Sequence, residues 1–162
     1  MVNIPLIALL LLQSAPTPGF ETFAGSYQLV KEESDDVAKA IDRVVAKMSA
    51  LTRGVARSRI TPKNIAYPSV NITKEGAGFR INLEKGSNVV LSPGGPAVEW
   101  KTADGEIVQI RLLPDAREVI TSKDGQRENH FSLAGGRLII KAKVTSGSLP
   151  EPIEYKLVYR RQ

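Results

Sequence analysis

Few residues of this chain could perform acid–base or nucleophilic chemistry. The 162 residues include one histidine, His130, and no cysteine, so a nucleophile–base pair would have to be built around this single imidazole. Glu128 and Ser132 occupy alternate positions beside His130 and would share its face of a strand. This spacing is ordinary for a polar strand face exposed to solvent. We therefore expect no catalytic residue and a protein that is not an enzyme.

Metal and cofactor chemistry is also not indicated. A metal site needs several side chains that converge, and no such cluster of ligands is visible. The carboxylates fall mostly in turns or on polar faces, so no acid–base pair stands out. Without cysteine, neither a disulfide nor a thiolate ligand is possible. The sequence predicts neither a metal nor a cofactor.

Length and composition favour one packed domain. Hydrophobic residues make up 42% of the chain and charged residues 24%. The formal net charge is +5, but the Lys and Arg residues are spread along the chain without interleaved aromatic residues. This pattern argues against a nucleic-acid partner. We expect a monomer.

An apolar run at residues 4–12 is followed by a Pro- and Gly-rich stretch at 16–19. The run is too short to cross a bilayer and has the length of the hydrophobic region of a signal peptide. We therefore predict a signal peptide and linker over residues 1–19, a single domain over 20–162, and export to the periplasm or outside the cell. If the run instead forms a buried strand or helix, the protein would be cytoplasmic.

The stretch 34–60 is the only one with apolar residues at helical spacing. The predicted stripe consists of Val37, Ile41, Val44, Met48, Leu51 and Val55. Ser34 is a candidate N-cap, and Gly54 is a candidate helix end before a second short helix at 55–60. The sequence thus predicts a helical hairpin whose apolar stripe is buried on the rest of the domain.

The rest of the chain predicts β-strands. Alternating segments separated by turn residues occur at 25–31, 69–74, 79–84, 88–91, 97–102, 106–113, 118–123, 126–133, 137–145 and 153–160. Asp-Gly pairs at 104–105 and 124–125 are strong hairpin signals. Ten strands with short connections predict an antiparallel up-and-down barrel, because closure removes the unpaired edges.

Alternation places an apolar face toward the inside of this barrel, together with three phenols. The inward-facing set includes Tyr27, Trp100, Phe131, Tyr155, Leu157 and Tyr159. The phenols could be bonded to each other, to the backbone or to water. Alternatively, ten strands enclose more space than side chains usually fill, and a remaining lumen would be a ligand site.

The order of one strand, a helical hairpin and nine strands resembles the intracellular fatty-acid-binding proteins of the calycin group. Residues 23–30, Phe-Ala-Gly-Ser-Tyr-Gln-Leu-Val, look like that family's opening F-x-G-x-W-x-L-V. Residues 35–41 look like the start of its first lid helix, and the turns at 102–105 and 124–126 and the closing 158–160 fall where similar residues fall in the family. The resemblance implies a hydrophobic ligand, such as a fatty acid, inside the barrel.

The family's carboxylate clamp is only partly present. The clamp uses an Arg-x-Tyr on the last strand and a further Arg two strands earlier, but here the last-strand triplet is Leu157-Val158-Tyr159, so only Tyr159 carries over. The earlier Arg would align near Phe131, and Arg127 lies elsewhere on the same strand. This departure from the family favours a head group that is neutral and bonded by Tyr155 or Tyr159, or one that stays at the portal near Arg57 and Arg59.

We predict non-enzymatic carriage of a hydrophobic ligand or lipid. The candidate ligand-binding residues are Tyr27, Trp100, Arg127, Phe131, Tyr155, Leu157 and Tyr159. The candidate portal residues, which could also meet an anionic membrane surface, are Met48, Arg53, Arg57 and Arg59. The alternative is a filled barrel that acts as an interaction module without a small ligand.

Overall fold

Nine antiparallel strands form a single sheet in the computed structural model, which describes residues 19–83 and 88–162. The strands are β1 (Gly25–Leu29), β2 (Ser69–Glu75), β3 (Gly78–Leu83), β4 (Val98–Lys101), β5 (Ile107–Leu112), β6 (Arg117–Ser122), β7 (Gly125–Ala134), β8 (Arg137–Thr145) and β9 (Ile153–Arg161). Their order is β3-β2-β1-β9-β8-β7-β6-β5-β4. The predicted antiparallel up-and-down meander is confirmed. Residues 1–18, which hold most of the predicted signal peptide and linker, lie outside the described residues.

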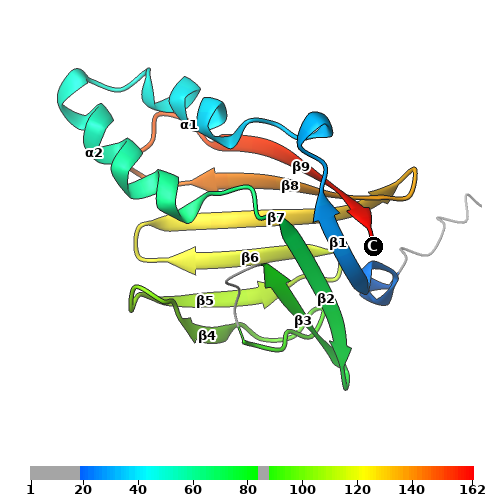
Figure 1. Cartoon of the computed structure of the whole chain (residues 1–162). Coiled ribbons are helices and arrows are strands. Elements are labelled where there is room, and N and C mark those ends of the chain that lie inside the picture. The colour runs from blue at the N-terminus through cyan, green and yellow to red at the C-terminus, as the bar shows by residue number, and fades with distance from the viewer. Residues whose placement is uncertain (1–18, 84–87) are drawn as a thin grey trace, which may run out of the picture.

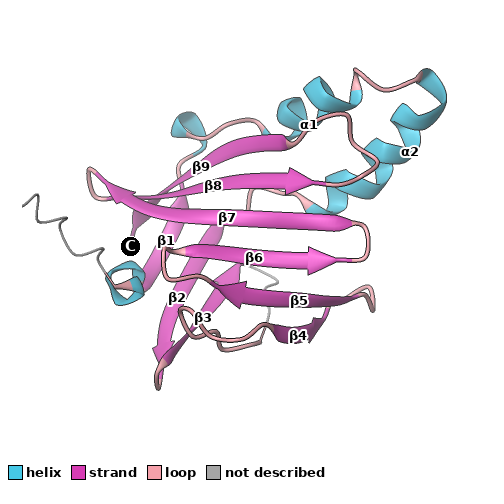
Figure 2. Cartoon of the chain, turned by 180° about the vertical axis from the view of Figure 1, so that it is seen from behind, coloured by secondary structure: helices cyan, strands magenta, loops and turns pink. Residues whose placement is uncertain are grey.

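The sheet curls so that β1, β2 and β3 run steeply across the other strands (Figures 1 and 2). Buried side chains from both parts of the sheet belong to one hydrophobic core. The curl brings β3 and β4, the two ends of the strand order, toward each other. This arrangement is a half-barrel, because β3 and β4 do not pair.

The segment between β3 and β4 bridges the gap. Leu91 and Phe79 exchange two backbone hydrogen bonds of 2.9 and 2.8 Å, and the Gly94 N–H donates to the Leu112 carbonyl at 2.8 Å. Pro93 forms a further isolated bridge with Leu112. One short segment thus contacts β3 on one side and β5 on the other.

The sheet has nine strands and not the predicted ten, and the difference lies in this segment. The expected strand at 88–91 is reduced to a single bridge at Leu91. Pro93 has no N–H to donate, and Gly94 has a φ of 73°, so the backbone turns away before a ladder can form.

Two α-helices lie at one end of the sheet, α1 (Val37–Val45) and α2 (Ala50–Ile60), as Figure 1 shows. Shorter 3₁₀ helices are η1 (Phe20–Phe23), η2 (Lys31–Glu33) and η3 (Thr61–Lys63). Helix α1 packs on β9 and buries five residues, Val37, Ala40, Ile41, Val44 and Val45. Helix α2 has no buried residue. Within the described ranges, none of the helices has the length and hydrophobicity needed to span a membrane.

The predicted hairpin is present, but its boundaries were wrong. The N-cap of α1 is Asp36 and not the predicted Ser34. The Asp36 carboxylate accepts a hydrogen bond from the Lys39 N–H at 3.1 Å. The chain leaves helical geometry between Val45 and Ala50, and Gly54 lies inside α2 rather than at its end. An added Cβ at Gly54 would touch nothing, so this glycine sits on an open helix surface.

The second half of the predicted apolar stripe is also not buried. Leu51 is 91% exposed and Val55 is 52% exposed. The stripe assumed one continuous helix axis, but the break between the helices gives α2 a different direction from α1. No strand makes a substantial contact with α2. Its Ala56 and Ile60 are partly buried against the hydrophobic core, whereas Leu51 and Val55 remain exposed.

Aromatic side chains fill the end of the barrel that lies opposite the α-helices. Phe20 of η1 lies 5.0 Å from Phe79 and 5.6 Å from Phe131, measured between ring centroids, both edge-on. Phe23 packs against Phe20 at 5.1 Å and against Phe131 at 6.3 Å. Offset and edge-on pairs at these distances stabilise beyond their buried area. Aromatic side chains therefore close one end of the barrel, and the two α-helices lie at the other end.

A segment after β1 completes the hydrogen bonding of β9. The Val30 N–H donates to the Val158 carbonyl at 2.8 Å, and the Asp35 N–H donates to the Lys156 carbonyl at 2.8 Å. Two side chains take the place of strand carbonyls: Ser34 Oγ accepts from the Val158 N–H at 2.9 Å, and the Asp35 carboxylate accepts from the Lys156 N–H at 2.7 Å. This strap, residues 30–35, pairs β9 beyond the end of β1.

We predict that Ser34→Ala lowers the free energy of unfolding by about 1–3 kcal/mol, because the N–H of buried Val158 loses its acceptor. Urea unfolding followed by circular dichroism measures this change. The matched control is Ser58→Ala, which removes only an exposed hydroxyl bonded to the Val55 carbonyl within α2. Its effect should stay within about 0.5 kcal/mol. Equal effects of the two substitutions would show that the strap does not stabilise β9.

Candidate functional site

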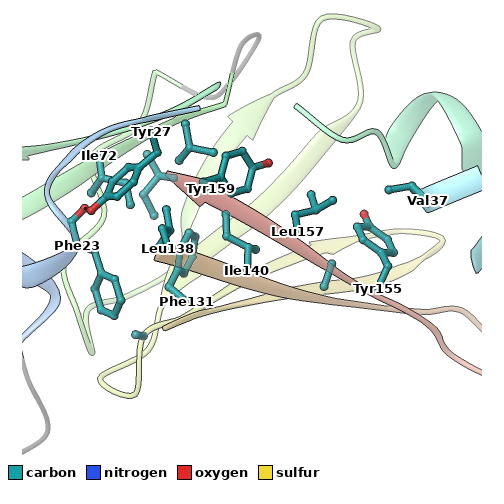
Figure 3. Close-up of a cluster of buried hydrophobic side chains, with 14 of the residues drawn as sticks. Phe23, Tyr27, Val37, Ile72, Phe131, Leu138, Ile140, Tyr155, Leu157 and Tyr159 are labelled. Atoms are coloured by element: carbon teal, nitrogen blue, oxygen red, sulfur yellow. Dashed lines mark hydrogen bonds between the residues drawn. The ribbon is translucent and has the colours of Figure 1, made fainter. Parts of the chain in front are cut away.

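The inward face of β9 carries Tyr155, Leu157 and Tyr159, as alternation predicted. These side chains follow one another on the side of β9 that carries the other buried residues, with Val37 of α1 at the Tyr155 end of the row (Figure 3). In the β8–β9 register they lie opposite Ala142, Ile140 and Leu138 in that order. Leu157 is 1% exposed and is enclosed by apolar side chains.

Two of the three predicted phenols are bonded to the backbone. The Tyr27 hydroxyl donates to the Phe23 carbonyl at 2.8 Å, and the Arg161 guanidinium lies over its ring at 5.5 Å. The Tyr159 hydroxyl donates to the Tyr67 carbonyl at 3.1 Å, and burial raises its pKa. The Tyr27 hydroxyl bond joins β1 to Phe23, the last residue of η1.

Polar side chains collect inside the barrel nearer the helices. The register places Glu118 of β6 opposite Asn129 of β7, and Asn129 opposite Ala142 of β8. Arg127, two residues before Asn129, shares the same inward face. We name Asn64, Glu118, Arg127, Asn129 and Tyr155 the interior polar cluster.

Hydrogen bonds connect three members of this cluster in a row. Arg127 Nε donates to Asn129 Oδ1 at 3.0 Å, and Asn129 Nδ2 donates to Glu118 Oε2 at 2.7 Å. Arg127 Nη1 also donates to the Lys63 carbonyl of η3 at 3.1 Å. Glu118 is 4% exposed and Asn129 is 1% exposed, so the row runs from the helix end of the barrel into its core.

Tyr155 joins the same cluster from β9. The Arg127 guanidinium lies 5.9 Å from the centroid of the Tyr155 ring, a favourable cation–π distance. The Tyr155 hydroxyl donates to Asn64 Oδ1 at 3.3 Å, and Asn64 Nδ2 donates to the Ile60 carbonyl at the end of α2. The cluster thus links the core of the sheet to the last turn of the helical hairpin.

Burial dominates the electrostatics of the cluster. It raises the pKa of the Glu118 carboxyl, and the hydrogen bond from Asn129 and the charge of Arg127 oppose this effect only in part. Burial likewise raises the pKa of Tyr155, with Arg127 acting in the opposite direction. The interior therefore favours the neutral forms of both groups.

The helix end of the barrel is less tightly covered than the aromatic end. Val98 and Trp100 of β4, Ile120 of β6 and Val144 of β8 face inward but are only half-buried. Trp100 therefore does not close the interior in the way that Phe131 does at the other end. Solvent reaches inward-facing apolar side chains near Arg127.

The predicted portal residues lie on or beside α2, but two of the arginines are engaged. Arg53 Nη2 donates to the Ala46 and Met48 carbonyls at 3.0 and 3.2 Å, so it covers the C-terminal end of α1. Arg57 forms an ion pair of 2.8 Å with Asp42. Met48 is half-buried between the helices, and Arg59 is exposed on α2.

Two hollows of the surface lie apart from the interior polar cluster. One, of about 290 Å³, is lined by Ala40, Arg43, Val44, Glu151, Pro152 and Glu154. The other, of about 420 Å³, lies between the turns at 121–126 and 145–147. Neither is lined by an inward-facing residue of the predicted ligand site.

His130 lies on the outer face, as predicted, opposite Arg117 of β6 and Lys141 of β8. It is exposed. Among the residues that the structure describes, no three His, Cys, Asp or Glu side chains are grouped so that they could hold a metal ion.

Sequence reasoning missed Glu118, Asn129 and Asn64. The alternation of side chains along β7 was sufficient to place Asn129 inside, because Asn129 lies two residues before Phe131 and shares its face. Glu118 was less visible, since it stands beside the apolar pair Val119 and Ile120, where alternation does not define a single inward face. Asn64 follows the hairpin and carries no pattern of its own.

We predict that Glu118→Gln stabilises the protein increasingly as pH rises. The folded state holds the Glu118 proton more tightly than the unfolded chain does, so the wild-type free energy of unfolding falls from about pH 4.3 through the folded-state pKa. Glutamine can still accept from Asn129 and does not titrate. The difference between variant and wild type should grow by up to about 1.4 kcal/mol per pH unit in that window. Urea unfolding at a series of pH values tests this, and parallel stability curves would contradict it.

The fold has clear counterparts among solved structures, although no protein-family model matches the chain and no curated sequence is significantly similar to it. A SAHS (abundant heat-soluble) protein from Ramazzottius varieornatus superposes with a TM-score of 0.58 at 11% identity, covering 87% of this chain and 96% of that one.

Two fatty-acid-binding proteins are also similar in structure, each at 18% identity with a TM-score of 0.52. The protein from Schistosoma mansoni, solved with arachidonic acid, covers 90% of this chain and 99% of its own. Fatty-acid-binding protein 1 of Echinococcus granulosus covers 87% and 98%. The chain therefore adopts the calycin-type β-barrel fold of the fatty-acid-binding proteins.

Proposed function

We propose that this protein binds a hydrophobic ligand or lipid inside the barrel and carries it without chemical change. The observation that carries the proposal is the interior polar cluster, which lies within an apolar wall and beside half-buried side chains at the helix end. Ligand pockets typically combine an apolar lining with a few placed polar groups. The structural counterparts that bind fatty acids support this assignment at the level of fold.

The apolar wall can supply affinity without a charged clamp. Each methylene of an acyl chain gains about 0.8 kcal/mol on burial, so roughly ten methylenes suffice for useful binding. The tail would lie between Trp100, Ile120 and Val144, and the polar end would bond to Tyr155 or Arg127. On the last strand, the position of the family's clamp Arg is occupied by Leu157, which offers only apolar surface.

A filled barrel used as an interaction module is the second candidate. The dense packing of Phe131 and Leu157, both almost fully buried, favours it for the aromatic half of the barrel. The half-buried Trp100 favours the carrier for the other half. The two functions therefore predict different results for ligand binding: a carrier binds a hydrophobic ligand at the helix end of the barrel, and a filled barrel binds none.

We predict that delipidated protein binds 1-monododecanoylglycerol with a dissociation constant in the micromolar range or tighter, measured by isothermal titration calorimetry. Trp100 fluorescence should shift on binding, because this residue is the only tryptophan and lines the half-buried end. Trp100→Ala should weaken binding at least about fivefold. The control Leu133→Ala, at the outer end of β7, should not. Absence of binding by fatty acids, fatty alcohols and acylglycerols alike would leave the filled barrel as the function.

We further propose that α2 meets an anionic membrane surface during ligand transfer, in a protein that the N-terminal apolar run directs out of the cytoplasm. Leu51 and Val55 are exposed on α2, and Arg59 is exposed on the same helix. Apolar and basic side chains together favour binding at a lipid interface. Because Arg53 and Arg57 are engaged within the hairpin, Leu51 and Arg59 are the residues available for this contact.

We predict that the double variant Leu51→Ser and Arg59→Ser slows transfer of a fluorescent acyl probe to anionic vesicles severalfold, since each basic residue near such a surface contributes about 1 kcal/mol. Transfer by the wild type should slow with added salt, which screens the charge. Equilibrium affinity for the probe should be unchanged. Leu133→Ser, at the far end of the barrel, is the control. Equal transfer rates for all three proteins would rule out the membrane contact.

A further inference from the structure

The interior polar cluster brings one carboxyl and one guanidinium into the same buried row. Asn129 bridges them, since it accepts from Arg127 Nε and donates to Glu118 Oε2. Glu118 approaches from β6 and Arg127 from β7, and both lie on the inward face. The row therefore holds a carboxyl close to Arg127, the residue to which the proposed function assigns the polar end of a ligand.

The guanidinium has little remaining capacity for a ligand carboxylate. Its Nε bonds to Asn129 and its Nη1 to the Lys63 carbonyl, so two of its three nitrogens are engaged. The guanidinium carbon also lies 5.9 Å from the centroid of the Tyr155 ring. A bidentate pair with a carboxylate, the strongest mode of Arg recognition, would require these contacts to break.

A second carboxylate in this interior would also meet Glu118. Because like charges repel and burial disfavours each of them, a ligand carboxylate could stay ionised in this site only while Glu118 keeps its proton. A hydroxyl head group sets no such condition on Glu118. It can donate to the Glu118 carboxyl and accept from Arg127 or Tyr155.

We propose that Glu118 selects the ligand class, so that the barrel accepts uncharged amphiphiles with a hydroxyl head group, of the fatty-alcohol or monoacylglycerol type, and disfavours fatty-acid anions. This inference rests on the proposed function of ligand binding in the barrel. It assigns Glu118 as a specificity-determining residue and Asn129 as the residue that positions it.

The test compares two ligands with the same tail, 1-dodecanol and dodecanoate, by isothermal titration calorimetry with the delipidated full chain at near-neutral pH. Wild type should bind the alcohol at least about tenfold more tightly, a difference of about 1.4 kcal/mol. Glu118→Gln keeps the shape and the acceptor for Asn129 but cannot carry a negative charge. It should reduce the preference for the alcohol at least about fivefold, mainly by strengthening dodecanoate binding.

The matched control is Glu128→Gln, the same chemical change on the outward face of β7, where Glu128 contacts Arg117 at 3.5 Å. Its ligand preference should equal that of wild type. A second measurement does not depend on ligand binding by a variant: the carboxyl carbon resonance of Glu118, assigned by its loss in Glu118→Gln, should shift when 1-dodecanol is added to wild type.

The outcomes separate the inference from the proposed function. If wild type binds both ligands equally well, or if Glu118→Gln leaves the preference unchanged, Glu118 does not select the ligand and the carrier function stands. If neither of these two ligands nor 1-monododecanoylglycerol binds, both the carrier function and the selection by Glu118 fail. A preference for the alcohol that Glu118→Gln reduces and Glu128→Gln retains supports the selection.

Discussion

The half-barrel depends on β9 being hydrogen-bonded along both sides. On one side β9 pairs with β8 over eight residue pairs, from Arg137–Arg160 to Val144–Ile153. On the other side β1 reaches only Tyr159, Arg160 and Arg161. The strap, residues 30–35, supplies the missing partners through two N–H groups and two side-chain oxygens. Unpaired backbone groups in a buried strand are costly, so this pairing is what allows β9 to lie inside the sheet and not at an edge.

The position of β9 decides where the polar interior lies. Because adjacent strands keep their inward residues in register, the row Tyr155, Ala142, Asn129 and Glu118 crosses four strands at one level of the barrel. Arg127 stands one inward position closer to the helix end. A polar group at this depth must find a partner, and the connected bonds of Arg127, Asn129 and Glu118 satisfy that requirement. The cluster is thus a consequence of strand register as much as of residue type.

The two ends of the barrel differ because different segments cover them. At one end η1 inserts Phe20 and Phe23 between strands, and their rings fill the space beside Phe79 and Phe131. At the other end α1 packs on β9, whereas α2 buries no side chain and is tied by single contacts such as the Arg57–Asp42 ion pair. Exposed ion pairs contribute little stability. Helix α2 therefore covers its end of the barrel less completely than η1 covers the other end.

The amino-acid sequence by itself determined the antiparallel meander and its inward face, because alternation and turn residues act locally along each strand. It placed Tyr155, Leu157, Tyr159 and Phe131 inside, and Arg127 on the right strand. The tertiary structure decided the rest. Pro93 and Gly94 could have ended a strand or joined two others, and only the curl of the sheet makes residues 88–95 a bridge between β3 and β5.

The helical hairpin shows the same division. The spacing of apolar residues predicted helices at 34–60, yet it could not show that Leu51 and Val55 would be exposed, since that depends on where the underlying sheet ends. Glu118 and Asn129 are not neighbours in the sequence. They come together only because the β6–β7 register places them opposite each other. Local patterns therefore defined the elements and their faces, whereas the pairing of distant strands decided which polar residues share the interior, because that pairing sets their distances in space.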